Sequence, residues 1–286
     1  MFDRIVCADW SRDPRRRGVF VAEVAERRIF EASAADVAGV LALARERTLI
    51  GFDASLAVSE SFLRATGKAS FVEWWWEGAF ARCEDASRWS PEAPFFAVPK
   101  GRGALQAFER AAAQRGVALR RRIEVATGAK PTFVVAGIPG CVGAASLDVW
   151  EGLRSARRRG VSFGLWPFEE TLPRVAETYP RACYATALIE ESPRARLSIA
   201  KSDARLRARA LERLRTMNWA RDVELAIGRA EESEDAFDAL MSAAALLRCA
   251  LEDLPMHGPV DRVEGAILGT GTIDLRLAER VFSASE

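Results

Sequence analysis

The chain has 286 residues, and its 41 Lys and Arg residues nearly balance its 40 Asp and Glu residues. This balance excludes a strongly basic protein that binds nucleic acid through a global positive field, so any nucleic-acid partner must be held by local patches. The chain also has a single histidine, His257, which argues against a histidine-based catalytic triad or zinc site.

The first strands and the first helix are predicted from the spacing of apolar residues. An antiparallel meander of three short strands is expected at residues 5–8, 18–24 and 27–32. Helical spacing then predicts a helix over residues 34–47, with Ser33 and Asp36 resembling a capping box. A buried strand follows at residues 48–52, and because a helix joins it to the preceding strands, we expect it to have a parallel neighbour.

Residues 54–173 interrupt this pattern, and we expect them to form a large, mostly helical insertion. Three adjacent tryptophans at residues 74–76 favour packing in a core or lid, and a platform for stacking nucleic-acid bases is the alternative. A helix is predicted over residues 146–159, closed by Gly160.

The last third returns to alternating strands and helices. Residues 161–168 and 174–178 are predicted to be strands. Ser202 is expected to cap an arginine-rich helix, and Ser233 is expected to cap a longer, alanine-rich helix with one apolar face.

Five acidic residues stand where these elements begin or end, and they are the candidate catalytic residues. Asp9 follows the first strand, Asp53 follows the fourth, and Glu177 lies in a late strand, close to its end. Asp235 and Asp238 lie three residues apart in the first turns of the alanine-rich helix, on one face. Ligands gather at the carboxyl ends of parallel strands, so Asp9 and Asp53 are expected to face each other there, with the helical pair pointing at the same spot.

Such a carboxylate cluster suits Mg²⁺ or Mn²⁺, with Asp9, Asp53 and Asp238 as the expected metal ligands. Two such ions ~4 Å apart hold an attacking water and a leaving oxygen in phosphodiester hydrolysis, and this chemistry needs no histidine. Each acid alone also suits a structural role, such as balancing a helix dipole, capping a turn or forming an ion pair. The combination of the acids favours the metal site.

Several short motifs occur along the chain in a fixed order. They are D-W-S at residues 9–11, G-F-D-A-S-L at 51–56, R-R-I-E at 121–124, W-P-F-E at 166–169, E-T-Y-P-R at 177–181, D-A-F-D-A-L at 235–240 and V-E-G-A-I-L at 263–268. In these motifs the chain resembles the bacterial domain of unknown function 429, whose members are predicted nucleases of RNase H-like fold. The resemblance covers nearly the whole chain.

The resemblance implies one RNase H-like α/β domain over residues 1–286, with a mixed five-stranded sheet flanked by helices. It puts Asp9 on the first strand, Asp53 at the end of the fourth, and Asp238, with Asp235, on the final helix. The spacing of that helical pair is similar to the paired acids of Holliday-junction resolvases. Glu177 matches an E-x-Y-P signature of the family. The insertions depart from a minimal core of this fold and leave the substrate class open.

The candidate substrate-binding residues are Ser11, Ser55, Glu124, Arg181 and Lys201. Each of the two serines lies two residues beyond a candidate acid and suits either a phosphate or a local turn hydrogen bond. Arginine clusters at residues 15–17, 120–122, 157–159 and 205–215 can hold the backbone of DNA or RNA through their guanidinium groups. The alternative for most of these clusters is that they lie on helix faces exposed to solvent.

The leading hypothesis is therefore a metal-dependent nuclease. The alternatives are a hydrolase or phosphotransferase acting on a small nucleotide or phosphorylated substrate, and a catalytically silent RNase H-like binding module. Scattered cysteines, a charged N-terminal segment and the shortness of the apolar runs predict a cytoplasmic protein with no membrane partner. The family resemblance implies a protein of bacterial type. No pattern in the sequence indicates the oligomeric state.

Overall fold

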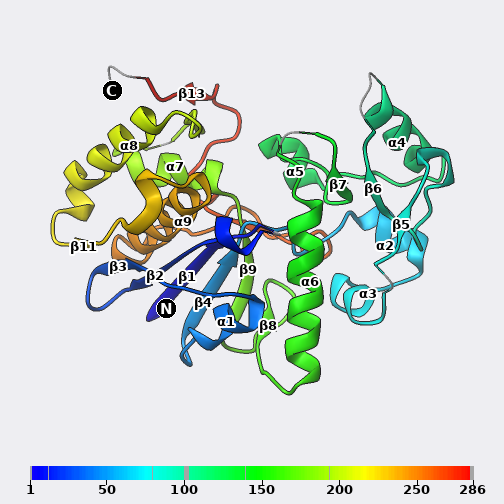
Figure 1. Ribbon diagram of the computed structural model, residues 1–286, viewed down its shortest axis with the longest axis horizontal. Helices are drawn as coiled ribbons and strands as arrows, with labels where there is room; N and C mark the ends of the chain where they lie inside the picture. Colours follow the sequence, from blue (N-terminus) through cyan, green and yellow to red (C-terminus); the bar gives the residue numbers. More distant parts are fainter. Residues whose placement is uncertain are drawn as a thin grey trace. The chain divides into compact units, whose positions relative to one another are not determined.

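The computed structural model describes residues 2–11, 13–78, 80–99, 103–138, 140–192 and 194–283 (Figure 1). The chain divides into two compact units. Unit 1 comprises Met1–Asp53, Ser162–Val260 and Ala266–Glu286, and unit 2 comprises Ala54–Val161 and Asp261–Gly265. The insertion expected over residues 54–173 overlaps most of unit 2.

Unit 1 is built on a mixed β-sheet. Its strands within the described residues are β1 (Arg4–Asp9), β2 (Gly18–Glu23), β3 (Arg28–Glu31), β4 (Thr48–Phe52), β8 (Gly164–Leu165), β9 (Arg174–Thr178), β11 (Glu224–Leu225) and β12 (Ile267–Leu268). Their order is β11-β3-β2-β1-β4-β9-β12, and β8 pairs with β9. The β1-β2-β3 meander is antiparallel, and the other pairings are parallel.

The predicted meander and the predicted parallel pairing of the fourth strand are confirmed. The sheet is larger than the expected five strands, because the two-residue strands β8, β11 and β12 extend it in the described part of the chain. Of the strand expected over residues 161–168, only Gly164–Leu165, which is β8, is a strand, and the rest of the prediction is wrong. The backbone turns there instead, because the amides of Phe168 and Glu169 both donate to the Leu165 carbonyl, at 2.8 and 2.9 Å.

Helices cover this sheet. They are α1 (Val37–Ala42), α7 (Pro180–Leu188), α8 (Ala204–Thr216) and α9 (Glu234–Leu251), with 3-10 turns η1 (Pro14–Arg16), η3 (Asn218–Ala220) and η4 (Gly228–Glu231). The predicted cap of α9 is confirmed, since the Ser233 side chain accepts the amide three residues on. The two other predicted caps are wrong. Asp36, not Ser33, caps α1, and Asp203, not Ser202, caps α8, because in each case the carboxylate reaches a first-turn amide.

One face of the sheet carries the main core of unit 1. Side chains alternate between the faces of a strand, and Ile5, Cys7 and Leu49 all point into the core that α7, α8 and α9 complete. Figure 1 shows these three helices lying together against the sheet. The same alternation puts Asp9, and Asp53 just beyond β4, on this helix-covered face.

A small second sheet in unit 1 pairs β10 (Leu197–Ser198) with β13 (Arg280–Val281). Its position matters because β10 leads into the turn that carries Lys201. His257 is half-buried and packs against Trp166 with ring centroids 4.8 Å apart. All five cysteines are free thiols. In the described part of the chain, no helix is long and apolar enough to cross a membrane.

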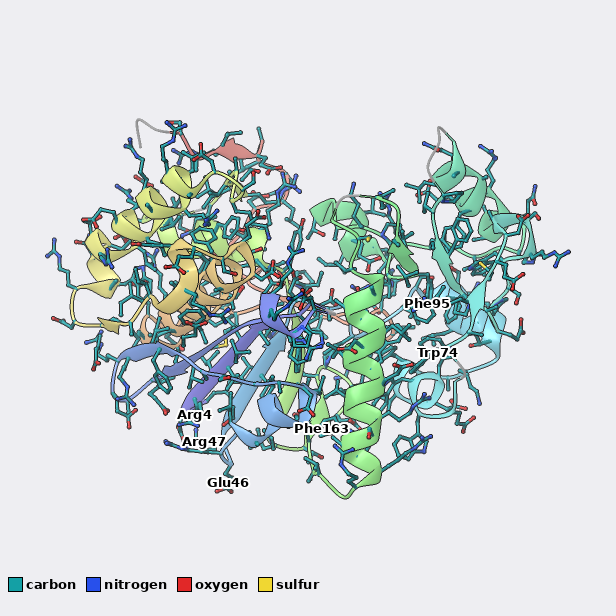
Figure 2. All side chains as sticks on the ribbon, in the orientation of Figure 1. Arg4, Glu46, Arg47, Trp74, Phe95 and Phe163 are labelled. Carbon is teal, nitrogen blue, oxygen red and sulfur yellow. The ribbon has the colours of Figure 1, made fainter. Side chains whose placement is uncertain are left out.

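Unit 2 has an aromatic core. Its elements are α2 (Glu60–Thr66), α3 (Phe71–Glu77), β5 (Arg82–Cys83), η2 (Ala86–Arg88), β6 (Phe95–Ala97), α4 (Ala104–Ala113), α5 (Arg122–Thr127), β7 (Val134–Ala136) and α6 (Gly143–Arg158), with β5, β6 and β7 in one sheet. Trp74 and Phe95, labelled in Figure 2, pack on Trp150 with ring centroids 5.4 and 5.7 Å from its own. Trp75 is fully buried, whereas Trp76 is 38% exposed. Two of the three adjacent tryptophans are therefore core residues.

Candidate active site

Asp9 and Asp53 are neighbours at the carboxyl ends of two parallel strands. Asp9 ends β1, Asp53 follows β4, and the Asp53 amide donates a hydrogen bond to the Ala8 carbonyl at 2.9 Å. This bond extends the pairing of the two strands by one residue and holds the acids side by side. Arg4 and Arg47, labelled in Figure 2, lie at the start of the same strands, so the acids occupy the opposite edge of the sheet.

Gly18 allows α9 to approach this edge closely. It pairs with Asp9 across β1 and β2, and a Cβ atom at this position would lie only 2.4 Å from the Asp235 carbonyl oxygen. Because glycine has no side chain, the first turn of α9 packs directly on the strand backbone. The close approach brings Asp235 and Asp238 towards the end of β1.

Asp238 is the centre of a buried hydrogen-bond network. It is 2% exposed, and the Tyr184 hydroxyl, from α7, donates to its Oδ1. The Lys201 ammonium donates to its Oδ2. The Asp9 carboxyl lies close enough to Asp238 for the two groups to influence each other's pKa. Asp9 and Asp238 therefore titrate as a pair.

The pKa values of the clustered acids are raised. Burial raises the pKa of Asp9 well above its ordinary 3.8, and the charges of Asp53 and Asp238 raise it further. Burial, followed by the charge of Asp238, raises the pKa of Asp53 to about 7 against the opposing charge of Lys201. Burial also raises the pKa of Asp238, again opposed by Lys201.

Lys201 is the ammonium that balances this cluster. Burial lowers its pKa, but the charges of Asp238 and Asp9 outweigh burial and raise it above the ordinary value of 10.5. One ammonium thus faces several carboxyls, and it does not offset all of their mutual repulsion.

Glu177 reaches the same edge of the sheet from β9, but on the other face. It pairs with Phe52 in the register of β4 and β9 and is 6% exposed. Ala176, its neighbour in the strand, points into the helix-covered core, so alternation turns Glu177 away from that face. Its charge still contributes to the raised pKa of Asp53. Glu177 therefore borders the cluster without joining its face.

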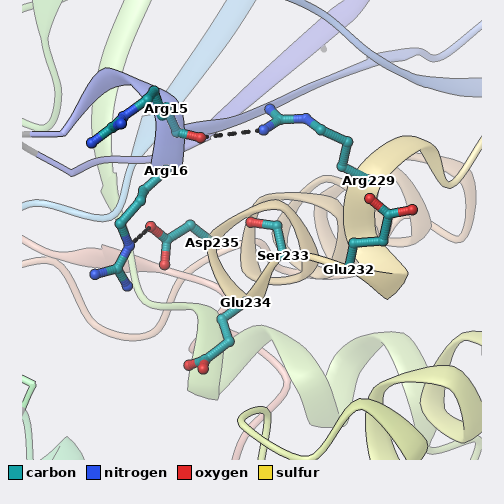
Figure 3. Close-up of a pocket in the computed structure, with 7 residues that line it drawn as sticks. All are labelled: Arg15, Arg16, Arg229, Glu232, Ser233, Glu234 and Asp235. Carbon is teal, nitrogen blue, oxygen red and sulfur yellow. Dashed lines mark hydrogen bonds and ion pairs between the residues drawn. The ribbon is translucent and has the colours of Figure 1, made fainter.

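Asp235 connects the cluster to a pocket of about 360 Å³ at the N-terminus of α9 (Figure 3). The pocket is lined by Arg15, Arg16, Arg229, Glu232, Ser233, Glu234 and Asp235. The Arg16 Nε lies 3.4 Å from Asp235 Oδ2, and the side chains of Arg15 and Arg16 are 90% and 64% exposed. Burial raises the pKa of Asp235, whereas Arg16 lowers it. One exposed arginine, Arg16, thus lies beside a carboxylate of the cluster, while Arg15 lines the same pocket and pairs with Asp13.

Two predicted substrate-binding residues of unit 1 contact other groups in the unit. Ser11 Oγ accepts the amide of Asp13 at 3.3 Å, which is a local turn hydrogen bond. Arg181 Nε donates to Glu279 at 2.9 Å, and its Nη2 donates to Ser198 Oγ at 3.2 Å. Neither contact belongs to the acid cluster, and a role of either residue in substrate binding stays a prediction.

The two other predicted residues, Ser55 and Glu124, lie in a buried network of unit 2. Glu124 is 1% exposed, and its Oε1 accepts from Arg121 Nε at 3.0 Å and from Thr132 Oγ1 at 2.9 Å. The Ser55 amide donates to Ser146 Oγ at 2.9 Å. Arg121 is itself 1% exposed, so the two opposite charges neutralise each other inside unit 2. This arrangement gives Glu124 a structural role.

Sequence reasoning misses two residues around Asp238 and Lys201. Tyr184 is one of only two tyrosines in the chain, and a buried phenol needs a hydrogen-bond partner, which is the signal that points to it. Arg207 is 5% exposed and donates to the Lys201 carbonyl and, at 2.8 Å, to the Glu231 carbonyl. In the sequence it is one arginine among many in α8, so no local signal distinguishes it.

The donor atoms of the acid cluster are all carboxylate oxygens, the ligands that Mg²⁺ and Mn²⁺ prefer. Among the residues that the structure describes, no three His, Cys, Asp or Glu side chains are arranged to hold a metal ion. The donor chemistry and the excess of buried acid nevertheless fit a hard divalent cation, and Asp9, Asp53 and Asp238 are the residues that would hold it.

Comparison with known proteins finds no matching family model, no matching curated protein and no matching solved structure. The resemblance to the domain of unknown function 429 therefore stays a prediction, and the function must be argued from the site.

Proposed function

We propose that this protein is a metal-dependent nuclease of RNase H-like fold that hydrolyses phosphodiester bonds. The order β3-β2-β1-β4-β9 supports the fold, with an antiparallel meander followed by parallel strands. The position of the acids supports the activity. They stand at the end of β1, directly after β4 and on α9, which is the arrangement that the family resemblance implies.

The observation that carries the proposal is the convergence of three carboxyls from distant parts of the chain. Asp9, Asp53 and Asp238 interact electrostatically at one edge of the sheet, where Asp9 and Asp238 are buried and Asp53 is half-buried. Burying mutually repelling acids is costly unless a cation balances them, so a fold that gathers them favours a cation-binding role. Acids with a purely structural role need not lie together in this way.

Mg²⁺ or Mn²⁺, when held by Asp9, Asp53 and Asp238, would polarise the phosphate and activate a water molecule. The chain itself supplies the positions of the ligands. The strand backbone fixes Asp9 and Asp53, and the Tyr184 hydroxyl orients Asp238. No histidine is needed as a general base, which agrees with the single histidine of the chain packing against Trp166 outside the cluster.

Exposed arginines near the cluster would bind the substrate. The Arg16 guanidinium lies next to Asp235, and Arg15, whose guanidinium pairs with Asp13, lines the same pocket. Guanidinium groups bind phosphate oxygens with two parallel hydrogen bonds. A DNA or RNA backbone held there would lie beside the acid cluster. Both arginines belong to η1, the first element after β1, so the segment that follows Asp9 in the chain carries this contact.

The experiment is a cleavage assay with labelled single-stranded, duplex, hybrid and branched DNA or RNA, in Mg²⁺ or Mn²⁺. Asp9→Asn and Asp238→Asn are expected to lower the rate by more than ~100-fold, because they remove ligand charge while keeping the side-chain shape. Asp274→Asn is the matched control, since that acid pairs with the exposed Arg276 elsewhere. Thermal unfolding of each variant shows whether the fold is kept.

Two results would contradict the proposal. One is the absence of cleavage of every polymer with both metals in a folded sample. The other is turnover of a mononucleotide or small phosphorylated substrate without polymer cleavage, which would support the small-substrate alternative instead.

A further inference from the structure

Both oxygens of Asp238 already accept hydrogen bonds within the chain. Tyr184 donates to Oδ1 and Lys201 donates to Oδ2. Each oxygen keeps a lone pair for a cation, but the Lys201 ammonium stands against Oδ2. A divalent ion that approached the same oxygen would be repelled by this ammonium, so it binds there only after Lys201 has withdrawn.

Lys201 is the donor that is free to move. Its side chain is 35% exposed, whereas Tyr184 is 3% exposed and packs against Phe237 with ring centroids 5.8 Å apart. Asp9 belongs to a central strand. The lysine side chain is a flexible chain of four carbons that ends in a well-hydrated ammonium, so it can withdraw into solvent without disturbing the core.

The backbone at Lys201 is held firmly, so that only the side chain needs to move. Its amide donates to the Ile199 carbonyl at 2.8 Å, and Arg207 donates to its carbonyl. Arg207 also bonds the carbonyls of Glu231 and Glu232, in the segment that leads into α9. This buried arginine therefore fixes the distance between the base of the lysine and the helix that carries Asp238.

The charges at the site favour an exchange of cations. Lys201 brings one positive charge to a cluster that contains Asp9, Asp53 and Asp238, and all three interact with it electrostatically. A divalent ion brings two positive charges and accepts several oxygens at once. It can therefore replace the ammonium at a site that the ammonium balances only in part.

We propose that the Lys201 ammonium occupies a cation position on Asp238, and that Mg²⁺ or Mn²⁺ binds by displacing it. The inference rests on the proposed metal site and deepens it. Lys201 is in this view a positioning residue that keeps the acids together without metal and sets the metal concentration at which the site fills. The displaced ammonium remains at the exposed rim of the cluster.

The test is calorimetric titration of the purified full-length chain with Mn²⁺. Lys201→Met is expected to bind Mn²⁺ at least about tenfold more tightly than the natural chain, because removal of a positive charge a few ångströms from a divalent ion favours binding by at least that factor. Lys201→Gln provides a second variant, in case the first folds poorly. Lys130→Met, at an exposed lysine of unit 2, is expected to leave the affinity unchanged.

A second measurement uses the natural chain alone. Lysine acylation, read by mass spectrometry, is expected to increase at Lys201 by several-fold when Mn²⁺ is added, with Lys130 as the internal reference. Unchanged or weaker Mn²⁺ binding by both Lys201 variants, or acylation that does not rise with Mn²⁺, would overturn the inference. The absence of Mn²⁺ binding by every variant would overturn both this inference and the proposed metal site. Tighter binding by the variants without cleavage of any polymer would refute the nuclease and leave the exchange at Lys201 standing.

Discussion

Replacing Asp53 by asparagine is expected to stabilise the protein at neutral pH. Asp53 is half-buried and is held near Asp238 and Glu177, and desolvation followed by these charges raises its pKa from 3.8 to about 7. The ionised carboxylate is therefore disfavoured in the folded chain. Asparagine keeps the size and shape of the side chain and cannot ionise, so Asp53→Asn removes this cost.

The size of this stabilisation, and the pH range in which it appears, follow from the ordinary and the raised pKa of Asp53. A difference of about 3 pH units corresponds to about 4 kcal/mol, at 1.36 kcal/mol for each unit. Below about pH 4 both the folded and the unfolded chain hold the proton, and Asp53 contributes no difference. Between about pH 4 and pH 7 the unfolded chain releases its proton first, so the stability of the natural chain falls as the pH rises. Above about pH 7 the full cost is present.

The free energy of unfolding is measured by urea denaturation, without divalent ions, at about pH 4 and about pH 8. Asp53→Asn is expected to match the natural chain at the lower pH and to exceed it by about 2–4 kcal/mol at the higher, where 4 is the upper bound because neighbouring acids ionise more readily once Asp53 is gone. Asp36→Asn is the matched control, since asparagine caps a helix as well as aspartate. A variant that is less stable than the natural chain at about pH 8, or a difference that is the same at both pH values, would refute the reasoning.

Two further substitutions test the packing. Gly18→Ala is expected to lower the free energy of unfolding by about 1–3 kcal/mol, because the new Cβ would lie 2.4 Å from the Asp235 carbonyl oxygen. Gly39→Ala is expected to raise the free energy of unfolding by about 1 kcal/mol, because the atom nearest to its new Cβ would be 3.4 Å away and alanine favours the helix. Equal urea midpoints for these two variants would contradict the close approach of α9. Arg121→Met is expected to cost about 3–5 kcal/mol, because it leaves the buried Glu124 without its charge partner. A loss below about 1 kcal/mol in the same assay would show that the pair is not needed for folding.

The strands near the site were predictable because their signal is local. A short, mostly apolar run specifies β4 with its observed bounds, Thr48–Phe52, and the helix before it implies a parallel partner. Helix caps were less predictable, since Ser33 and Asp36 both suit a cap and only the backbone decides which one meets an amide. The short strands β8, β11 and β12 have no signal of their own, because two residues show no periodicity.

The sequence by itself determined which acids are candidates and on which element each one stands. A residue at the end of a strand or in the first turn of a helix is recognisable from neighbours a few positions away. Only the tertiary structure decided which candidates meet. It brings Asp9, Asp53 and Asp238 to one face, turns Glu177 to the other, and buries Glu124 against Arg121 in unit 2. It also supplies Tyr184 and Lys201 as the donors to Asp238. Such contacts join residues far apart in the chain, and they depend on strand register and on how closely a helix approaches the sheet, neither of which a local pattern encodes.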